Sequence, residues 1–253
     1  MTNPFFDTGP ERAAKVQGLF ARIAPRYDLI NDLQSLGLHR YWKRRLIRLA
    51  RVQAGVRALD LCCGTGDLAL ALARRGAEVV GLDFSQPMLE VAQRRKPTPP
   101  PLRRRGGALR NLHFIRADAQ RLPFPDNSFE IVTVGYGLRN LASWEAGLGE
   151  MQRVARPGGR LLALDFGKPA HALWRSLYFG YLRLFVPWFG RLFFGNASAY
   201  AYILQSLEQY PGQQGVATKM RELGLDTVRV INLAGGAMSI NYAEKGPTHA
   251  ATE

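Results

Sequence analysis

Short apolar runs alternate with stretches of helical periodicity along most of the chain, which is typical of a parallel sheet whose strands are joined by helices. The runs that we interpret as strands are 56–61, 77–83, 114–118, 129–135 and 160–166. The stretches that we interpret as helices are 12–23, 42–51, 68–73, a segment from Ser85, 144–154 and 214–223. Two later runs, 227–232 and 237–243, flank Gly235-Gly236 and predict a closing hairpin. The pattern therefore predicts an α/β fold.

One stretch, 171–202, breaks this alternation directly after the fifth strand. It is rich in Trp, Tyr and Phe with arginines between them, and Pro187 divides it, so it predicts two amphipathic helices. Composition leaves two interpretations open. The insert is either a subdomain packed into the core or an apolar lid that touches a membrane, with its arginines against anionic headgroups.

A glycine turn joins the first strand to the next helix, and this unit is typical of nucleotide-binding α/β proteins. Gly64 and Gly66 allow positive φ and a close approach of the ligand to the backbone. The turn fits G-x-G-x-x-G/A, but no Gly-Lys-Ser/Thr follows it, which excludes a P-loop. Asp60 ends the strand, and a carboxylate there suits a cationic ligand better than a pyrophosphate. A nucleoside-like, cationic ligand without phosphate is S-adenosylmethionine.

Two more acids end the next two strands. Asp83 closes the second strand, and an acid about 20 residues past the glycine turn typically accepts hydrogen bonds from ribose hydroxyls. Asp118 ends the third strand, where methyltransferases usually carry an acid that faces the adenine amino group. The order and spacing of three strand-end acids favour a shared ligand over coincidence.

Residues 27–42 are polar and aromatic together and precede the first strand. They form either a helix that caps the sheet edge or a wall of the acceptor pocket, and composition favours neither. The following helix, 42–51, is strongly basic, and we interpret it as a solvated face.

The charge balance changes the picture of possible partners. The 253 residues contain 34 Lys and Arg against 20 Asp and Glu, a net charge of +14, which implies an anionic partner without identifying it. The basic loop 94–107 has no interleaved aromatic residues, which disfavours nucleic-acid binding.

The cysteines indicate the cellular compartment. Cys62 and Cys63 are adjacent, so an ordinary disulfide between them is geometrically implausible, which fits a reducing cytoplasm. We find neither a signal peptide nor an apolar run long enough to span a membrane, so a cytoplasmic location is expected.

These motifs together resemble the ubiquinone/menaquinone biosynthesis C-methyltransferases over nearly the whole chain, from about Val16 to Lys245. The residues that carry the resemblance are Tyr27-Asp28-x-x-Asn31-x-x-x-Ser35-x-x-x-His39-x-x-Trp42, the paired cysteines with the glycine turn, Gly137-Leu-Arg139-Asn140, Arg153-Val154-x-x-Pro157-Gly158-Gly159, Tyr202-x-x-x-x-Ser206 and Gly235-Gly236. Gln34 departs from the pattern, as do Asp165 and Gly167, where the family usually has glutamate and serine. The 94–107 loop looks like an insertion.

The resemblance implies one class I S-adenosylmethionine-dependent methyltransferase domain over 1–253, with a Rossmann-like seven-stranded sheet whose last strand is antiparallel. It implies an N-terminal helical cap at 12–51, within which the stretch 27–42 becomes the acceptor wall. It also implies a helical lid at 168–205 that binds the prenyl chain and faces a membrane. It is compatible with a homodimer.

The resemblance also implies the site residues. The cofactor set is Asp60, Gly64, Thr65, Gly66, Asp83, Phe84, Met88, Asp118, Ala119 and Tyr136. The acceptor set is Tyr27, Asn31, His39 and Tyr202, and the catalytic set is Tyr27, Arg139 and Asn140. Arginine is a poor proton acceptor, with a pKa above about 12. We therefore expect Arg139 to stabilise the developing phenolate and orient a water, and Asn140 to hold the quinol oxygen or that water. We expect no metal.

The expected reaction is methylation of a ring carbon of a demethylated prenyl quinol, specifically demethylmenaquinol. A benzoquinol of the ubiquinone pathway, a phytyl naphthoquinol and a small phenol are alternative acceptors. An RNA methyltransferase is a rival suggested by the positive charge, but the chain has no Asn-Pro-Pro-Tyr-type motif and no added RNA-binding domain.

Overall fold

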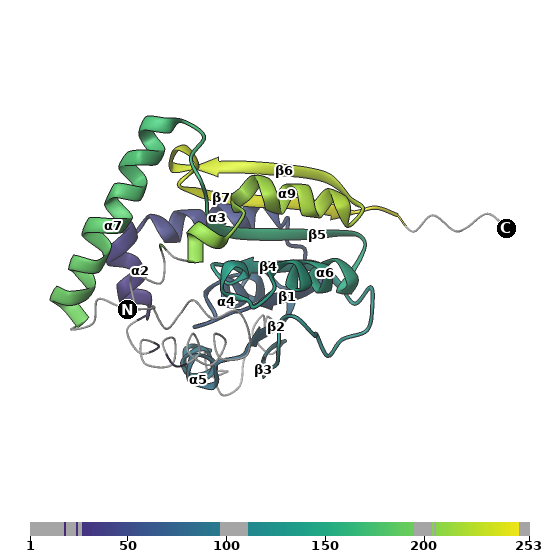
Figure 1. Cartoon of the computed structure of the whole chain (residues 1–253). Coiled ribbons are helices and arrows are strands. Elements are labelled where there is room, and N and C mark those ends of the chain that lie inside the picture. Colours follow the sequence, from purple (N-terminus) through teal and green to yellow (C-terminus); the bar gives the residue numbers. More distant parts are fainter. Residues whose placement is uncertain are drawn as a thin grey trace.

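The computed structural model describes residues 27–96, 111–194 and 206–247 together with Gly18, Ala24 and Leu204, and only the backbone over 185–194. Seven strands form a single sheet in the order β3-β2-β1-β4-β5-β7-β6 (Figure 1). The strands are β1 (Arg57–Leu61), β2 (Glu78–Asp83), β3 (Leu112–Arg116), β4 (Phe129–Gly135), β5 (Ala155–Phe166), β6 (Leu225–Leu233) and β7 (Met238–Lys245). The predicted α/β sheet is confirmed.

The direction of the strands divides the sheet into two parts. The first five strands are parallel, whereas β7 pairs antiparallel with both β5 and β6. The predicted antiparallel last strand is therefore confirmed. Because β2 and β3 follow β1 on one side and β4 and β5 lie on the other, the strand order reverses between β1 and β4. Open α/β sheets bind ligands at such a reversal, outside the carboxyl ends of the strands.

Helices cover both faces of the sheet. They are α4 (Asp67–Ala73), α5 (Gln86–Arg95), α6 (Trp144–Val154) and α9 (Gly212–Glu222), with α2 (Tyr27–Ser35), α3 (Leu38–Leu49) and α7 (Ala172–Phe194) outside the strand–helix repeat. Successive side chains of a strand point to opposite faces. Accordingly Ile131 of β4 packs in one buried cluster with α3 and α4, and its neighbour Val132 packs in a second cluster with α6 and α9.

The glycine turn has the local geometry that its sequence predicts. Gly64 and Gly66 have φ of 54° and 85°, in the left-handed region that favours glycine. A Cβ on Gly66 would lie 3.0 Å from the ring of Phe114 and 3.1 Å from Ala92. The turn is therefore restricted both by its backbone and by the side chains packed against it.

The insert after β5 differs from the prediction of two helices divided by Pro187. The backbone forms one helix, α7, which continues past Pro187 to Phe194. A proline deprives the helix of one amide hydrogen bond, and here the flanking turns continue the helix across that gap. Towards its N-terminal half, α7 packs Tyr178 and Leu182 against Ile30 of α2 and Leu207. Figure 1 shows α7 beside α2 at one side of the molecule.

Other predicted elements differ mainly in their ends or lie outside the described residues. The basic helix predicted at 42–51 is α3, which begins earlier, after Gly37 with φ of 75°. The predicted helix 12–23 lies outside the described residues except for Gly18, as does the loop 94–107 beyond Lys96. Within the described part of the chain, no helix is both long and apolar enough to cross a membrane.

Candidate functional site

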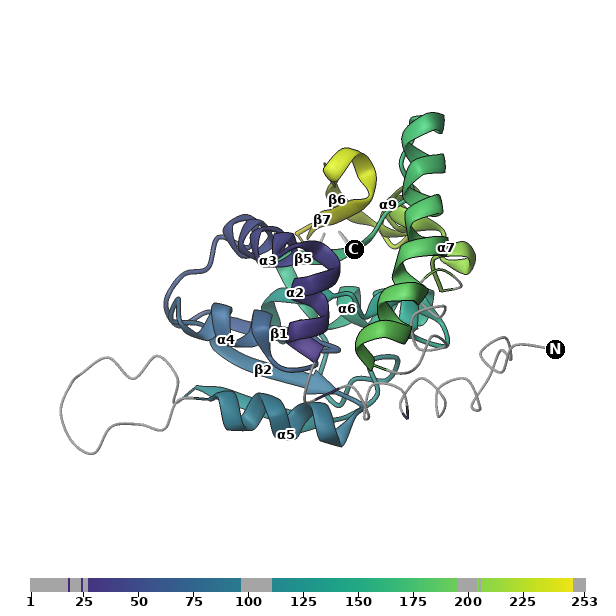
Figure 2. The same cartoon turned by 90° about the vertical axis from the view of Figure 1, so that its left-hand side faces the viewer.

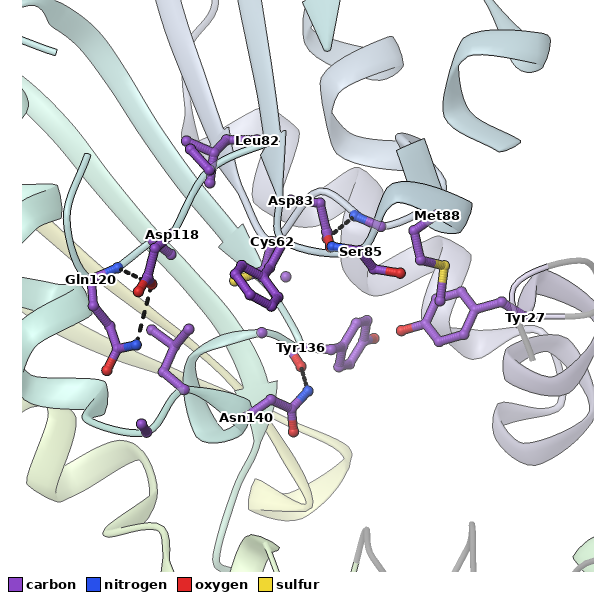
Figure 3. A pocket seen from close by; sticks show the side chains of 18 residues that line it. Tyr27, Cys62, Leu82, Asp83, Ser85, Met88, Asp118, Gln120, Tyr136 and Asn140 are labelled. Atoms are coloured by element: carbon purple, nitrogen blue, oxygen red, sulfur yellow. Dashed lines mark hydrogen bonds between the residues drawn. The ribbon is translucent and has the colours of Figure 1, made fainter. Parts of the chain in front are cut away.

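A cavity of about 170 Å³ lies at the carboxyl ends of the parallel strands, where the strand order reverses. Its walls come from the start of α2, the glycine turn, the β2–α5 junction, the loop after β3 and the loop after β4. In the view of Figure 3, Asp118 and Gln120 lie at one end and Tyr27 and Met88 at the other, with Tyr136 between them. The two ends of this row of side chains carry different chemical groups.

Asp83 holds the glycine turn and the start of α5 together. One carboxylate oxygen accepts a hydrogen bond from the backbone amide of Gly64 at 2.8 Å, and the other accepts one from the amide of Ser85 at 2.8 Å. Burial raises the pKa of this carboxyl group, while the amide donors act in the opposite direction. Each oxygen has a second lone pair directed away from its amide donor. Asp83 lines the cavity and can therefore accept ligand hydroxyl donors as well.

Asp118 is positioned by Gln120, which the sequence analysis did not identify. One oxygen of Asp118 accepts hydrogen bonds from the backbone amide of Gln120 at 2.9 Å and from its side-chain amide at 3.2 Å. The side-chain oxygen of Gln120 in turn accepts from the amide of Ser143 at 2.7 Å. The acid after β3 is therefore fixed in direction at the cavity wall.

Asp60 occupies a different environment from the other two acids. It is 1% exposed and lies outside the lining of the main cavity. One oxygen accepts from the backbone amide of Ala69 at 3.0 Å, and the other lies 2.7 Å from the hydroxyl oxygen of Thr133. Burial raises the pKa of Asp60 to about 7. In the described contacts, Asp60 joins the end of β1 to α4 and to β4.

The loop after β4 is held by a buried ion pair. Tyr136 has φ of 61°, and its carbonyl oxygen accepts hydrogen bonds from Arg139 and from the side-chain amide of Asn140, both at 3.0 Å. Arg139 forms an ion pair with Asp165 at the end of β5; the two side chains are 6% and 5% exposed. The guanidinium also lies 4.6 Å from the centre of the Phe166 ring. Asn140 lines the cavity, and Arg139 lies behind the lining residues.

Side-chain contacts hold the start of α2 over the glycine turn. One oxygen of Asp28 accepts from the hydroxyl of Thr65 at 2.8 Å, and the other accepts from Arg95 of α5 at 2.7 Å. Arg95 also pairs with Asp67 at 2.6 Å, and Lys43 of α3 pairs with the second oxygen of Asp67 at 2.6 Å. This places Tyr27 in the cavity wall, where burial raises the pKa of its phenol.

Many of the predicted site residues come together at this cavity. Those that line it are Tyr27, Gly64, Asp83, Phe84, Met88, Asp118, Ala119, Tyr136 and Asn140. Thr65 and Asp60 lie beside it, in a smaller cavity that shares Tyr27 and Gly64 with the first. Gly66 and Asn31 are absent from the lining of both cavities, and Tyr202 lies outside the described residues.

His39 does not join this group. It is 4% exposed, its Nδ1 lies 3.0 Å from the hydroxyl of Ser35, and its own amide donates to that hydroxyl at 3.2 Å. These contacts brace the junction of α2 and α3. Burial lowers the pKa of His39.

The lining residues that sequence reasoning did not assign to the site include Cys62, Ser85 and Gln120, and it did not assign Asp165, the partner of Arg139. Cys62 and Ser85 directly neighbour predicted turn and strand-end residues, which is the signal that could have found them. Ser85 begins α5 as expected, but among the described residues its buried hydroxyl has no hydrogen-bond partner and does not cap the helix. The pairing of Asp165 with Arg139 depends on two strand ends meeting in space.

Comparison of the sequence with known families gives one match over almost the full chain. A sequence model of the ubiE/COQ5 methyltransferase family matches residues 9–245. The ubiquinone/menaquinone biosynthesis C-methyltransferase UbiE of Azotobacter vinelandii is 41% identical over 238 residues, covering 93% of this chain and 91% of that protein. The protein of the same name from Burkholderia mallei is 40% identical, with 93% and 94% covered.

Solved structures are similar in fold at much lower identity. A possible histamine N-methyltransferase from Thermotoga maritima has a TM-score of 0.61 at 16% identity, covering 91% of this chain and 99% of that one. An S-adenosylmethionine-dependent methyltransferase from Aquifex aeolicus has a TM-score of 0.55 at 17% identity, with 80% and 88% covered. These similarities confirm the predicted fold class.

Proposed function

The chain belongs to the ubiE/COQ5 methyltransferase family and is an S-adenosylmethionine-dependent C-methyltransferase, and we propose that its acceptor is demethylmenaquinol, a demethylated prenyl naphthoquinol. The predicted family, activity and cofactor are thereby confirmed. The relatives' names include both ubiquinone and menaquinone, so the ring of the acceptor is part of the proposal.

We propose that the cofactor occupies the strand-end side of the cavity. Its adenine amino group donates to Asp118, and its ribose hydroxyls donate to Asp83. The support for this assignment is the direction of the two acids, since the amides of Gly64, Ser85 and Gln120 already fix each carboxylate at the wall. The methionine end then crosses the glycine turn towards Thr65 and Tyr136, beside the smaller cavity.

The acceptor ring is proposed to lie between Tyr27 and Asn140, while Met88 stays in the cofactor set that the resemblance implies. Both line the cavity, and in Figure 3 Tyr27 lies at the end away from Asp118, with Asn140 beside Tyr136. A flat aromatic ring fits between apolar and aromatic side chains, and the amide of Asn140 can hydrogen-bond a quinol oxygen. Asn31 lies one turn after Tyr27 on α2 and is proposed to act on the Tyr27 phenol, whose pKa burial raises and Asn31 lowers to a smaller extent.

The reaction is a displacement at the methyl carbon. The quinol ring carbon forms a bond to the methyl group while the methyl–sulfur bond breaks, and the electron pair stays on sulfur. The ring becomes nucleophilic as a phenolic proton leaves to water. The ring hydrogen is lost afterwards as a second proton, and the quinol oxygen takes one proton back, so that one proton is released overall. The protein chiefly aligns acceptor carbon, methyl and sulfur, and alignment of this kind accounts for up to about 7–11 kcal/mol of a barrier.

We propose that Arg139 stabilises the developing phenolate and orients the water that accepts its proton. Its pairing with Asp165 and its contact with Phe166 would hold the guanidinium in one orientation behind Asn140. An Arg–carboxylate pair is directional because the guanidinium donors have a fixed planar geometry. The buried pair thus supports a positioned cation rather than a mobile one.

The prenyl chain of the substrate suggests contact with a membrane. We propose that α7 is the lid that receives this chain. Its exposed face carries Leu173, Leu177 and Leu184, the last 71% exposed, at helical spacing. An exposed apolar stripe of this kind is typical of an interaction surface rather than a solvated helix.

The observation that carries the proposal is the joint lining of one cavity by Asp83, Asp118, Tyr27 and Asn140 in a chain of this family. The test is methyl incorporation into a matched panel of demethylated quinols with the same prenyl length: a prenyl naphthoquinol, a phytyl naphthoquinol and a prenyl benzoquinol. We expect the highest kcat/KM with the prenyl naphthoquinol. A higher kcat/KM with the benzoquinol would show that the acceptor is a benzoquinol, and the proposed C-methylation would still hold.

A further inference from the structure

A second, strongly basic depression lies outside the site described above. This basic groove, of about 450 Å³, is formed by α3, α4 and α5 together with the start of α2. Its cations are Arg40, Lys43, Arg44, Arg74, Arg75 and Arg95. Among the described residues, the acids that line it with them are Asp28 and Asp67.

Pairing within the protein leaves a surplus of positive charge in the basic groove. Arg95 and Lys43 are neutralised by Asp28 and Asp67, the contacts that hold α2 over the glycine turn. Arg40 is neutralised by Asp32. In the described part of the chain, Arg44, Arg74 and Arg75 form no side-chain hydrogen bond or ion pair, and all three are exposed. Three unpaired guanidinium groups, from α3 and from the turn that follows α4, therefore lie at one groove.

Exposed apolar side chains lie at the α2–α3 corner and on α3, the helix that also supplies cations to the groove. Leu36, at the corner between α2 and α3, is 88% exposed, and Leu38 and Tyr41 of α3 are also exposed. Tyr181 of α7 donates to the carbonyl oxygen of Gln34 at 3.2 Å, which joins α7 to that corner. In Figure 2, α2 lies between α7 on one side and α3 and α4 on the other. The apolar stripe of α7 and the basic groove thus flank the same helix, whose first residue lines the cavity.

We propose that the basic groove binds the phosphate groups of anionic phospholipids and orients the enzyme on the membrane. The inference rests on the proposed function, because a prenyl quinol resides in the bilayer. Guanidinium groups bind phosphate through parallel hydrogen bonds, and the neighbouring Leu36, Leu38 and Tyr41 enter the interfacial layer. Docked in this way, α2 faces the bilayer, and the acceptor end of the cavity opens towards the lipid.

The exposed apolar side chains favour lipid over other phosphate compounds. Free phosphate has no apolar part that exposed leucines could contact, whereas a lipid headgroup is attached to apolar chains. A single-stranded nucleic acid is usually held by aromatic platforms along a charged channel. Here the one exposed aromatic side chain on α3, Tyr41, is accompanied by aliphatic ones.

The test compares two double variants of equal charge. Arg44→Gln/Arg75→Gln removes two unpaired cations from the groove, and Arg121→Gln/Arg221→Gln removes two exposed arginines elsewhere. Binding is measured by sedimentation with phosphatidylcholine vesicles with and without phosphatidylglycerol. At about 1 kcal/mol per basic residue near an anionic surface, the groove variant should bind anionic vesicles roughly 30-fold more weakly than the parent. The control variant should lose much less affinity for anionic vesicles. The two variants should bind neutral vesicles equally.

Equal losses in the two variants would overturn the proposal, as would equal binding of the parent to neutral and anionic vesicles. Displacement by inorganic phosphate, but not by chloride of the same ionic strength, would make the groove a free-phosphate site. An RNA mobility shift that only the groove variant loses would make it a nucleic-acid surface. Thermal unfolding checks that both variants fold.

A separate measurement distinguishes failure of the groove from failure of the proposed function. Methyl transfer to a short-chain, water-soluble naphthoquinol is measured without vesicles, and its absence in the parent would contradict the proposed function rather than the groove.

Discussion

The carboxyl edge of the sheet and the helical layer beside it are built by different kinds of contact. At the edge, backbone groups hold the functional side chains: the Asp83 carboxylate is fixed by two amides, and Asp118 by the amide of Gln120. In the helical layer, side chains provide the contacts between α2 and its neighbours, through Asp28 with Thr65 and Arg95 and through Ile30 packed against α7. The layer also leaves Leu177 and Leu184 of α7 exposed.

This difference suggests how the two halves of the site work. A pocket fixed by backbone contacts is pre-organised, so a ligand orders little when it binds. A segment held by a few side-chain contacts opens at low cost, which suits a lid that admits a bulky lipid. We therefore expect variants at the sheet edge to change cofactor affinity, and variants in the layer or in the loop after β4 to change turnover.

The largest effect on methyl transfer is expected at Arg139. Arg139→Ala should lower kcat by about 10²–10³, the usual cost of one donor that stabilises transition-state charge, and leave S-adenosylmethionine affinity nearly unchanged. Arg139→Lys should recover only part of the loss, because an ammonium cannot copy the planar guanidinium. Steady-state kinetics and calorimetry measure the two quantities.

Removing Arg139 also leaves Asp165 buried without its partner, so the unfolding temperature is measured beside the rates. Arg156→Ala, which removes an exposed arginine paired with Glu130, is the matched control. Near-parental kcat in folded Arg139→Ala protein would show that the assigned role is wrong.

A smaller effect is expected at Asp83, and it should change cofactor affinity rather than turnover. Asp83→Ala removes the acceptor for the ribose hydroxyls and should weaken S-adenosylmethionine binding by about 1.5–3 kcal/mol, or roughly 10- to 150-fold. Asp226→Ala, at the exposed start of β6, is the control. Calorimetry with unchanged affinity in Asp83→Ala would remove Asp83 from the cofactor site.

The smallest effect on methyl transfer is expected at Asp60, whose described contacts are all internal. Because its pKa is raised to about 7 from 3.8, the folded protein keeps a proton that the unfolded chain releases. This group therefore adds stability below about pH 4 that is lost as pH rises to about 7, by about 1.4 kcal/mol per unit of pKa difference. Asp60→Asn preserves an acceptor for Ala69 and a donor for Thr133, so it should abolish this decline.

Unfolding temperatures of the parent and of Asp60→Asn, recorded from pH 4 to pH 8, check this expectation. Asp67 makes both proteins less stable as the pH falls, which is the opposite of the pH dependence expected from Asp60. Ion pairing with Lys43 and Arg95 outweighs its burial and lowers its pKa to about 2, so its stabilisation is lost only as pH falls below about 4. Parallel curves for the two proteins would mean that Asp60 is ionised when folded.

The sheet was predictable because its signals are local. The strand 129–135, the helix 144–154 and the positive φ angles of Gly64 and Gly66 depend on nearby residues, and the structure confirms them. The continuity of α7 across Pro187 was not predictable, because a proline inside a helical pattern usually ends or kinks the helix.

The site was predictable to a similar extent and for the same reason. Asp83 and Asp118 follow strands directly, so their place at the sheet edge depends on topology alone. Asp60 also ends a strand, but its side chain turns towards Ala69 and Thr133, which only the packing of α4 and β4 determines. The pairing of Arg139 with Asp165 likewise joins two strands through the tertiary fold.

The central claim is that methyl transfer goes to a ring carbon of the quinol. The most direct measurement is one reaction of the purified protein with demethylmenaquinol and S-adenosylmethionine labelled in its methyl group, followed by tandem mass spectrometry of the product. The account predicts the label on the ring carbon, with both quinol oxygens still unmethylated. A label on a quinol oxygen would contradict it. So would a quinol that stays unlabelled while a different acceptor, offered in its place, is methylated completely.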